Sequence, residues 1–212
     1  SLSVGESFEG SHTDFSQIGV GIGDSTDIDN NDNIDALTGS YLDETVTLTS
    51  AFSGTVHEIE TVNLASGTLN KFTEFDEHLA TVNGAEGNEF LEFGLEYNGA
   101  ISELESIALA EGSDNVMTTD EALNSIQGVE GSEESITISA AFGGVVQELE
   151  EITLAADTTN YINDTTGDLE KITGSEDGEE IVILGTDFSG EISEIETLVV
   201  AAGSINGSVD NE

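Results

Sequence analysis

A repeat of about 45 residues is the feature that most constrains the fold. Four segments of the chain align without internal gaps, and they begin at residues 49, 94, 139 and 185. A fifth, weaker copy opens the chain, because residues 1–21 fit residues 45–65. Copies of this kind fold as a stack, in which each one covers the apolar side of the next. The repeats are placed at about 1–44, 45–89, 90–134, 135–180 and 181–212, with the first divergent and the last incomplete.

The same kinds of residue recur at the same place in each copy. The aromatic column holds Phe8, Phe52, Tyr97, Phe142 and Phe188, and a glycine column two positions later holds Gly10, Gly54, Gly99, Gly144 and Gly190. An asparagine column holds Asn70, Asn115, Asn160 and Asn206. We expect the asparagines to be structural, as a ladder that faces inward or caps turns.

The apolar spacing within a copy predicts short strands joined by bends. Val46 and Leu48 alternate with polar residues, as in a strand. Ile59, Val62 and Leu64 reach one interior only if the chain bends between residues 59 and 62. We therefore predict one all-β repeat domain over 1–212, a parallel β-solenoid of the β-roll or β-helix kind. A copy of 45 residues is long for a single coil, so we expect two coils per copy.

Other folds fit this pattern less well. The 24 glycines and the absence of a sustained helical period disfavour helices. Separate domains of 45 residues would bury too little surface to fold alone. A single β-sandwich remains open, although equal spacing of equal columns is not typical of one.

Charge excludes several functions. The chain has 45 Asp and Glu against two basic residues, Lys71 and Lys171, and a formal net charge of −43. Such a polyanion cannot neutralise phosphates, so neither nucleic acid nor an anionic membrane surface is an expected partner. The chain has no cysteine, which excludes disulfides and thiolate metal sites. No apolar run is long enough to insert into a membrane, no signal peptide is visible, and the start at Ser1 suggests a processed product or a fragment.

Acidic residues recur in three columns. The first holds Glu44, Glu89, Glu134 and Glu180; the second Glu58, Glu103, Glu148 and Glu194; and the third Glu60, Glu105, Glu150 and Glu196. We expect stacking to turn these columns into ladders of like charge that need a counter-ion. Oxygen ligands without nitrogen or sulfur favour hard cations, so the second and third columns are predicted to bind Ca²⁺.

The densest acidic segment is residues 23–35, and it is a further candidate calcium site. The ligands predicted there are Asp24, Asp27, Asp29, Asn31, Asp32 and Asp35. The segment resembles an EF-hand loop only superficially, because Asp32 and Thr38 stand where that loop needs glycine and glutamate. Residues 175–180 and the connector 157–168 are weaker candidates.

Calcium binding and a structural role each have an alternative. The alternative to calcium binding is adaptation to salt, because an acidic surface also keeps proteins soluble in concentrated salt, and Glu columns recur through duplication alone. Catalysis is not expected: His12, His57 and His78 are scattered, and no nucleophile elbow or dinucleotide fingerprint is present. Polysaccharide lyases that combine a solenoid with calcium are similar only in fold, because this chain has no arginine to act as their base.

One stretch of each copy resembles a known repeat. It reads FSGTVHEIETVNLA at 52–65 and FSGEISEIETLVVA at 188–201. This is similar to the "IETLNL"-type repeats of secreted bacterial S-layer proteins and large RTX-type adhesins. The resemblance implies a parallel β-solenoid and calcium-dependent assembly of a coat, matrix or adhesin outside the cell. The glycine-rich RTX nonapeptide is absent, so the calcium geometry of that family does not transfer.

The expected function is therefore that of a secreted structural protein at the cell surface or outside the cell. Copies of the chain would assemble head to tail into a fibre, matrix or surface layer, with Ca²⁺ bridging acidic faces. The alternative is a stalk or binding segment of a large calcium-dependent adhesin. Ice binding by a threonine-bearing face is a third reading, disfavoured because Thr45, Thr47 and Thr49 occur together in one copy only.

Overall fold

The structure is a computed structural model that describes residues 2–3, 9–11, 17–19, 21, 25–29, 34–40, 42–200 and 209–210. The regular elements in these residues are all β-strands. No helix long and apolar enough to cross a membrane occurs among them. The chain forms two compact units, the first made of Ser1–Leu95 with Gly99–Ser106 and the second of Glu96–Asn98 with Ile107–Glu212.

The strands are short and evenly spaced along the chain. Those of the first unit are β1 (Leu2–Ser3), β2 (Glu9–Ser11), β3 (Gln17–Gly19), β4 (Ser25–Asp29), β5 (Ala36–Thr38), β6 (Thr45–Leu48), β7 (Ser53–His57), β8 (Thr61–Asn63), β9 (Leu69–Phe75), β10 (Thr81–Asn83), β11 (Phe90–Phe93) and β12 (Ala100–Ser102). Those of the second unit are β14 (Asp114–Met117), β15 (Ser125–Gln127), β16 (Ser135–Ile138), β17 (Gly143–Gln147), β18 (Glu151–Thr153), β19 (Thr159–Asp164), β20 (Lys171–Thr173), β21 (Ile181–Leu184), β22 (Glu191–Ser193), β23 (Thr197–Val200) and β24 (Val209–Asp210). Strand β13 (Ser106–Ala108) lies at the division between the units.

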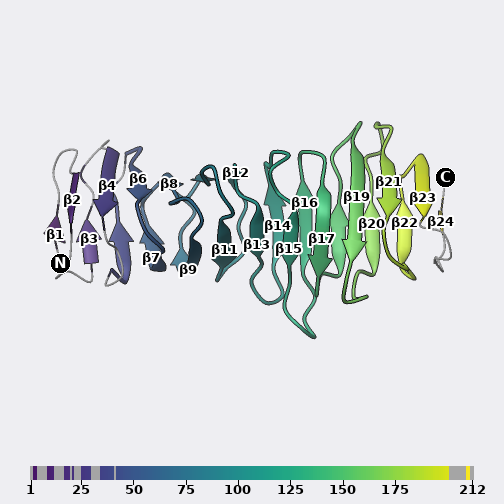
Figure 1. Cartoon of the computed structure of the whole chain (residues 1–212), viewed down its shortest axis with the longest axis horizontal. Coiled ribbons are helices and arrows are strands. Elements are labelled where there is room, and N and C mark those ends of the chain that lie inside the picture. Colours follow the sequence, from purple (N-terminus) through teal and green to yellow (C-terminus); the bar gives the residue numbers. More distant parts are fainter. Residues whose placement is uncertain are drawn as a thin grey trace. The chain divides into compact units, whose positions relative to one another are not determined.

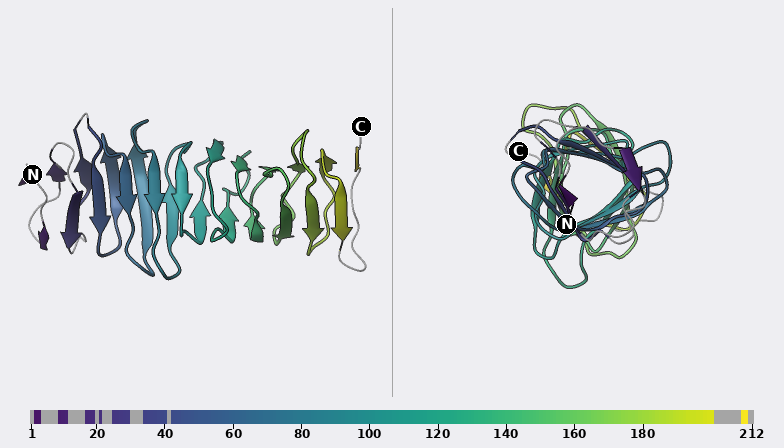
Figure 2. Two further views of the ribbon diagram at one scale, coloured as in Figure 1. Left: turned by 90° about the horizontal axis from the view of Figure 1, so that it is seen from above. Right: turned by 90° about the vertical axis from the view of Figure 1, so that its left-hand side faces the viewer.

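In each unit the chain alternates between two parallel sheets. In the first unit the odd-numbered strands β1 to β11 form one sheet and the even-numbered strands β2 to β12 form the other. In the second unit the odd-numbered strands β15 to β23 form one sheet and the even-numbered strands β14 to β24 form the other. Every pairing described within the units is parallel, and Figures 1 and 2 show the strands of each unit following one another in chain order. This is the predicted parallel β-solenoid.

The core of each unit is built from rungs of equivalent aliphatic residues. In the first unit Val46, Val62, Val82 and Ile101 are register partners on β6, β8, β10 and β12. In the second unit the partners are Ile136, Ile152, Ile172 and Ile192. All eight side chains are at most 3 % exposed. Each contributes roughly 2 kcal/mol of burial, and it does so only because the next turn covers it.

The predicted bend before residue 62 is present. Ile59, Val62 and Leu64 are all buried, and the chain turns between β7 and β8. Glu58 has a φ of 51°, in the left-handed region that lets the chain change direction within one residue. The glycine column has a different cause, because a Cβ at Gly54 would lie 2.3 Å from the carbonyl oxygen of Asp35 on the preceding turn.

One copy of the sequence repeat contains five strands, which is two and a half turns. The copy at 45–89 runs from β6 to β10, so it opens in the even-numbered sheet, whereas the next copy opens with β11 in the odd-numbered sheet. The second unit behaves in the same way, with β16 and β21 opening successive copies in different sheets. The expectation of two coils per copy is therefore wrong by half a turn.

Among the residues that the structure describes, the asparagine column is structural, as predicted, and Asn206 lies outside them. Asn70, Asn115 and Asn160 are at most 2 % exposed. Their Oδ1 atoms accept hydrogen bonds from the backbone N–H of the aromatic column, at 3.0 Å for Phe52, 2.9 Å for Tyr97 and 2.8 Å for Phe142. Each amide therefore satisfies a buried backbone donor that no strand pairs.

We predict that Asn160→Ala lowers the free energy of unfolding by about 1–3 kcal/mol, because the N–H of Phe142 loses its acceptor in a buried site. Urea unfolding followed by circular dichroism measures the change. Thr159→Ala, at an exposed position of the same strand, is the matched control and should leave the midpoint nearly unchanged. Equal effects of the two substitutions would contradict the structural role of the asparagine.

Candidate functional site

The first acidic column lies inside the solenoid. Glu44, Glu89, Glu134 and Glu180 are at most 1 % exposed. Each directly precedes a strand, respectively β6, β11, β16 and β21. A buried carboxylate is costly unless its oxygens are hydrogen-bonded, so the partners of these four groups decide what they do.

Backbone amides satisfy these buried carboxylates. The Oε1 atom of Glu134 accepts from the N–H of Gly112 at 2.7 Å, and its Oε2 atom accepts from Val129 at 2.9 Å. Glu180 repeats the arrangement with Asp157 at 2.9 Å and Ser175 at 3.0 Å. Glu134 and Glu180 thus each tie two loops of neighbouring turns together.

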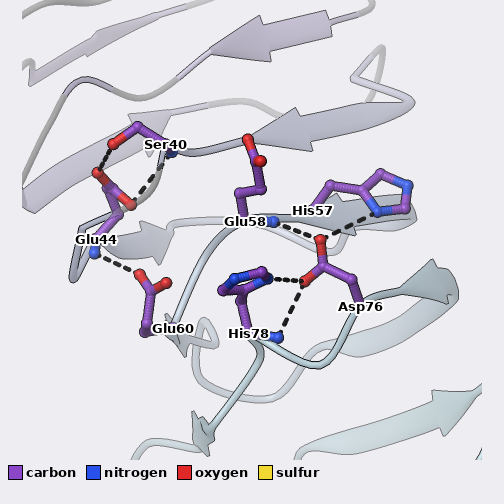
Figure 3. A network of polar contacts seen from close by, with 7 residues as sticks. All are labelled: Ser40, Glu44, His57, Glu58, Glu60, Asp76 and His78. Atoms are coloured by element: carbon purple, nitrogen blue, oxygen red, sulfur yellow. Dashed lines mark hydrogen bonds and ion pairs between the residues drawn. The ribbon is translucent and has the colours of Figure 1, made fainter.

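The third acidic column completes this motif. The backbone N–H of each buried glutamate donates to the carboxylate 16 residues later, over 2.6–2.9 Å. The acceptors are Glu60, Glu105, Glu150 and Glu196. Figure 3 shows the bond from Glu44 to Glu60 and the contacts between Glu44 and Ser40. These predicted calcium ligands therefore have a structural role.

The second column provides the corners of the solenoid. Glu58, Glu103, Glu148 and Glu194 all have φ between 49° and 54°. Their carbonyl oxygens face a further glycine column, in which a Cβ would lie only 1.8–1.9 Å away. That column, Gly39, Gly84, Gly128 and Gly174, was missed at the sequence level, although its recurrence five or six residues before the buried glutamates is a detectable signal.

The acidic columns do not stack as ladders of like charge, which corrects the expectation from the sequence. Within the first unit Glu58 follows β7 and Glu103 follows β12, so the two lie after strands of different sheets. Within the second unit Glu148 and Glu194 are separated in the same way, after β17 and β22. The reason is the half turn in each repeat, which moves equivalent residues to the other sheet in the next copy.

Acidic groups from different places in the repeat come together instead. In the second unit a depression of about 670 Å³ is lined by Asp114, Glu133, Glu150, Glu151, Asp168 and Glu170, among others. Glu148 lies beside it and its carboxylate is hydrogen-bonded to that of Asp168. Partial burial, Asp168 and the charges of Glu130 and Glu150 together raise the pKa of Glu148.

Glu150 experiences opposing influences. Partial burial raises its pKa most strongly, and the negative charges of Glu134 and Asp168 raise it further. The hydrogen bond from the backbone N–H of Glu134 lowers the pKa, but the net direction is upward. Ionised carboxylates therefore oppose one another in this part of the second unit.

Basic groups offset little of this charge. Lys71 on β9 pairs with Glu92 on β11, and the Nζ atom of Lys171 lies 3.6 Å from Glu151 on the neighbouring strand. These are the only two lysines, and the chain has no arginine. Most of the acidic side chains thus have no Lys or Arg to pair with.

Two histidines meet at one carboxylate, which the sequence did not indicate. The Nδ1 atom of His57 lies 3.6 Å from Asp76 Oδ2, and that of His78 lies 3.4 Å from Asp76 Oδ1 (Figure 3). Asp76 also accepts the backbone N–H of Glu58 at 2.8 Å. The separation of 19 residues between Asp76 and His57, close to one turn, is the signal that was available.

The acidic segment 23–35 is described in part. Asp24, Asn31 and Asp32 lie outside the described residues. Asp27 is half-buried on β4, Asp29 ends the same strand, and Asp35 is exposed just before β5. Within the described ranges, no group of three or more His, Asp or Glu side chains is arranged to hold a metal ion. Calcium binding therefore stays a prediction.

Acidic residues of the connector 157–168 also have a structural role. Asp164 is 7 % exposed and accepts backbone N–H groups from Gly167 at 2.9 Å and from Leu169 at 3.3 Å. Asp157 has a φ of 58° and donates its own N–H to Glu180. The two acids shape loops of the second unit.

Comparison with protein-family models, with curated proteins and with solved structures finds no match to this chain.

We predict that Glu134→Gln destabilises the protein by about 1–3 kcal/mol, since the substitution replaces a buried charged acceptor and turns an amide N–H₂ toward backbone donors. Chemical denaturation at pH 7 measures the loss. Glu133→Gln, at the exposed neighbouring position, removes the same charge and should be neutral or slightly stabilising. The buried-glutamate motif would be contradicted if both variants were equally stable.

A second prediction concerns pH. Because the folded state raises the pKa of Glu148, its protonated form adds stability at low pH, and this stability is lost as pH rises through the raised value. Glu148→Gln should therefore raise the Tm at neutral pH in dilute buffer, and its advantage should disappear in acid below about pH 4. Thermal melts over a pH series test this, with the exposed Glu121→Gln as control. A Tm difference independent of pH would refute the carboxylate contact.

Proposed function

We propose that this chain is a structural segment that works outside the cell, where divalent cations, Ca²⁺ above all, offset and bridge its acidic surface. One observation carries the proposal. Carboxylates such as Glu148 and Asp168 lie in direct contact, in a chain whose two lysines are already engaged. A folded solenoid of this kind is strained by its own charge, and a cation that binds only the folded state relieves the strain.

The rest of the architecture agrees with a structural role. The recurrent polar side chains serve the backbone: asparagines accept amides of the aromatic column, and glutamates link neighbouring turns. A turn of such a stack pairs with a further turn through the edges of its strands. We propose that copies associate head to tail through such edges, because unlike ends give open filaments or layers rather than closed rings.

Folding would then be coupled to export. In a compartment poor in calcium, self-repulsion opposes the folded state. In calcium-rich surroundings a cation present at 100 times its dissociation constant adds about 2.7 kcal/mol of stability. The second candidate function, a stalk of a large calcium-dependent adhesin, uses the same coupling but needs no self-association.

Calcium should raise the Tm of the chain far more than NaCl of the same ionic strength does. A chelator should weaken the β signal in circular dichroism. Melts in Ca²⁺ are compared with melts in NaCl of equal ionic strength. Equal rescue by NaCl would favour salt adaptation and overturn the calcium proposal.

Two double variants with the same change in charge locate the effect. Glu148→Gln with Asp168→Asn should reduce the calcium-dependent rise in Tm, whereas Glu121→Gln with Glu176→Gln, both at exposed positions, should preserve it. Light scattering and electron microscopy across a millimolar calcium series test assembly. Filaments or layers support self-association, and a monomer at every concentration supports the stalk instead.

A further inference from the structure

The outer face of the even-numbered sheet in the first unit carries two uncharged columns. The threonine column is Thr45, Thr61 and Thr81 on β6, β8 and β10, and it ends at Ala100 on β12. The amide column, two residues along each strand, is Thr47, Asn63, Asn83 and Ser102. We call these two columns the neutral face.

The neutral face is regular in the fold although it is irregular in the sequence. Thr45 and Thr61 occupy different places in one 45-residue copy, yet the register makes them neighbours. Each of four successive turns contributes one residue to each column. Every residue in a column is the register partner of the residue on the next strand. The sequence analysis compared equivalent positions of successive copies, so it did not show the column that Thr45, Thr61 and Thr81 form on successive turns of one copy.

Hydrogen bonds hold the amide column in place. The Nδ2 atom of Asn83 donates to Asn63 Oδ1 at 2.8 Å, and Ser102 Oγ donates to Asn83 Oδ1 at 2.7 Å. Asn63 Nδ2 donates in turn to Thr47 Oγ1 at 3.1 Å. The threonines beside them are stiff at χ1 because they are β-branched. Both columns thus present fixed polar atoms, which reduces the entropy lost on binding.

The charge of the face indicates the partner. No acidic or basic side chain interrupts either column from β6 to β12, in a chain with a net charge of −43. The neighbouring strand β4 ends the uncharged stretch, since Asp27 pairs with Thr47. By contrast, the corresponding column of the second unit contains Glu151 and Lys171. A neutral patch of hydroxyls and amides suits an uncharged, hydrogen-bonding surface.

The two columns also contain no aromatic side chain, which argues against a carbohydrate platform, where rings usually stack on sugars. We propose that the neutral face binds ice. Its rungs repeat about every 4.8 Å, and its two columns stand about 6.7 Å apart along the strands. Both spacings are on the scale of the oxygen repeats in hexagonal ice, so ordered water on the face can merge with the crystal.

Slow growth of ice from a dilute solution of the whole chain tests the proposal. We expect the wild-type protein to concentrate in the ice fraction and to separate the melting and freezing points of small crystals. Thr61→Lys and Thr81→Lys should each abolish both effects, because a lysine in the centre of the face disrupts the ordered water. Thr153→Lys on β18 of the second unit is the matched control and should retain them.

Circular dichroism melts of all variants show whether each one folds, and a loss of ice binding counts only in a variant with the wild-type melt. Exclusion of the wild-type protein from ice would overturn the proposal, as would equal loss in Thr153→Lys. Retention of insoluble polysaccharide without any ice binding would also overturn it. So would a dimer, seen by sedimentation, that Thr61→Lys dissociates in a protein without ice activity.

Discussion

The aliphatic rungs support every other feature of the two units. A turn of about 18 residues, such as that from Ser125 to Gly143, cannot bury its own apolar side chains, so Ile136 and Ile152 are covered only because the next turn repeats them. This requirement fixes the parallel register. The register in turn decides which polar residues meet on the outside, including carboxylates that repel one another and hydroxyls that form an ordered array.

The acidic residues divide into two physical classes. Buried glutamates such as Glu134 accept backbone amides and have their own N–H satisfied by an acid 16 residues later, so these carboxylates act as connectors between turns. Acids such as Glu148 and Asp168 lie against each other, and partial burial together with this contact raises the pKa of Glu148. A polyanion of this composition therefore uses part of its charge to build the fold, and the remainder is what an external cation can relieve.

The half-integral number of turns per repeat has a consequence beyond geometry. Because equivalent residues alternate between the two sheets, a duplicated sequence does not place identical charges on adjacent rungs. Glu58 lies near Asp76 and its two histidines rather than near Glu103. The same alternation brings Thr45, Thr61 and Thr81 into one column, although they come from different positions of the repeat.

The sequence by itself determined the fold class, the inward columns, the bend before Val62 and the structural asparagines, because these depend on local periodicity and on a composition that repeats every 45 residues. Only the tertiary structure decided where each copy lies, since five strands per copy in a two-sheet solenoid cannot be counted from apolar spacing alone. For the same reason the sequence did not predict three features: the burial of Glu44 and its equivalents, the contact of Glu148 with Asp168, and the neutral face. Each depends on which residues a neighbouring turn places opposite, about 16 to 23 residues away along the chain, and periodicity within a copy carries no information about that register.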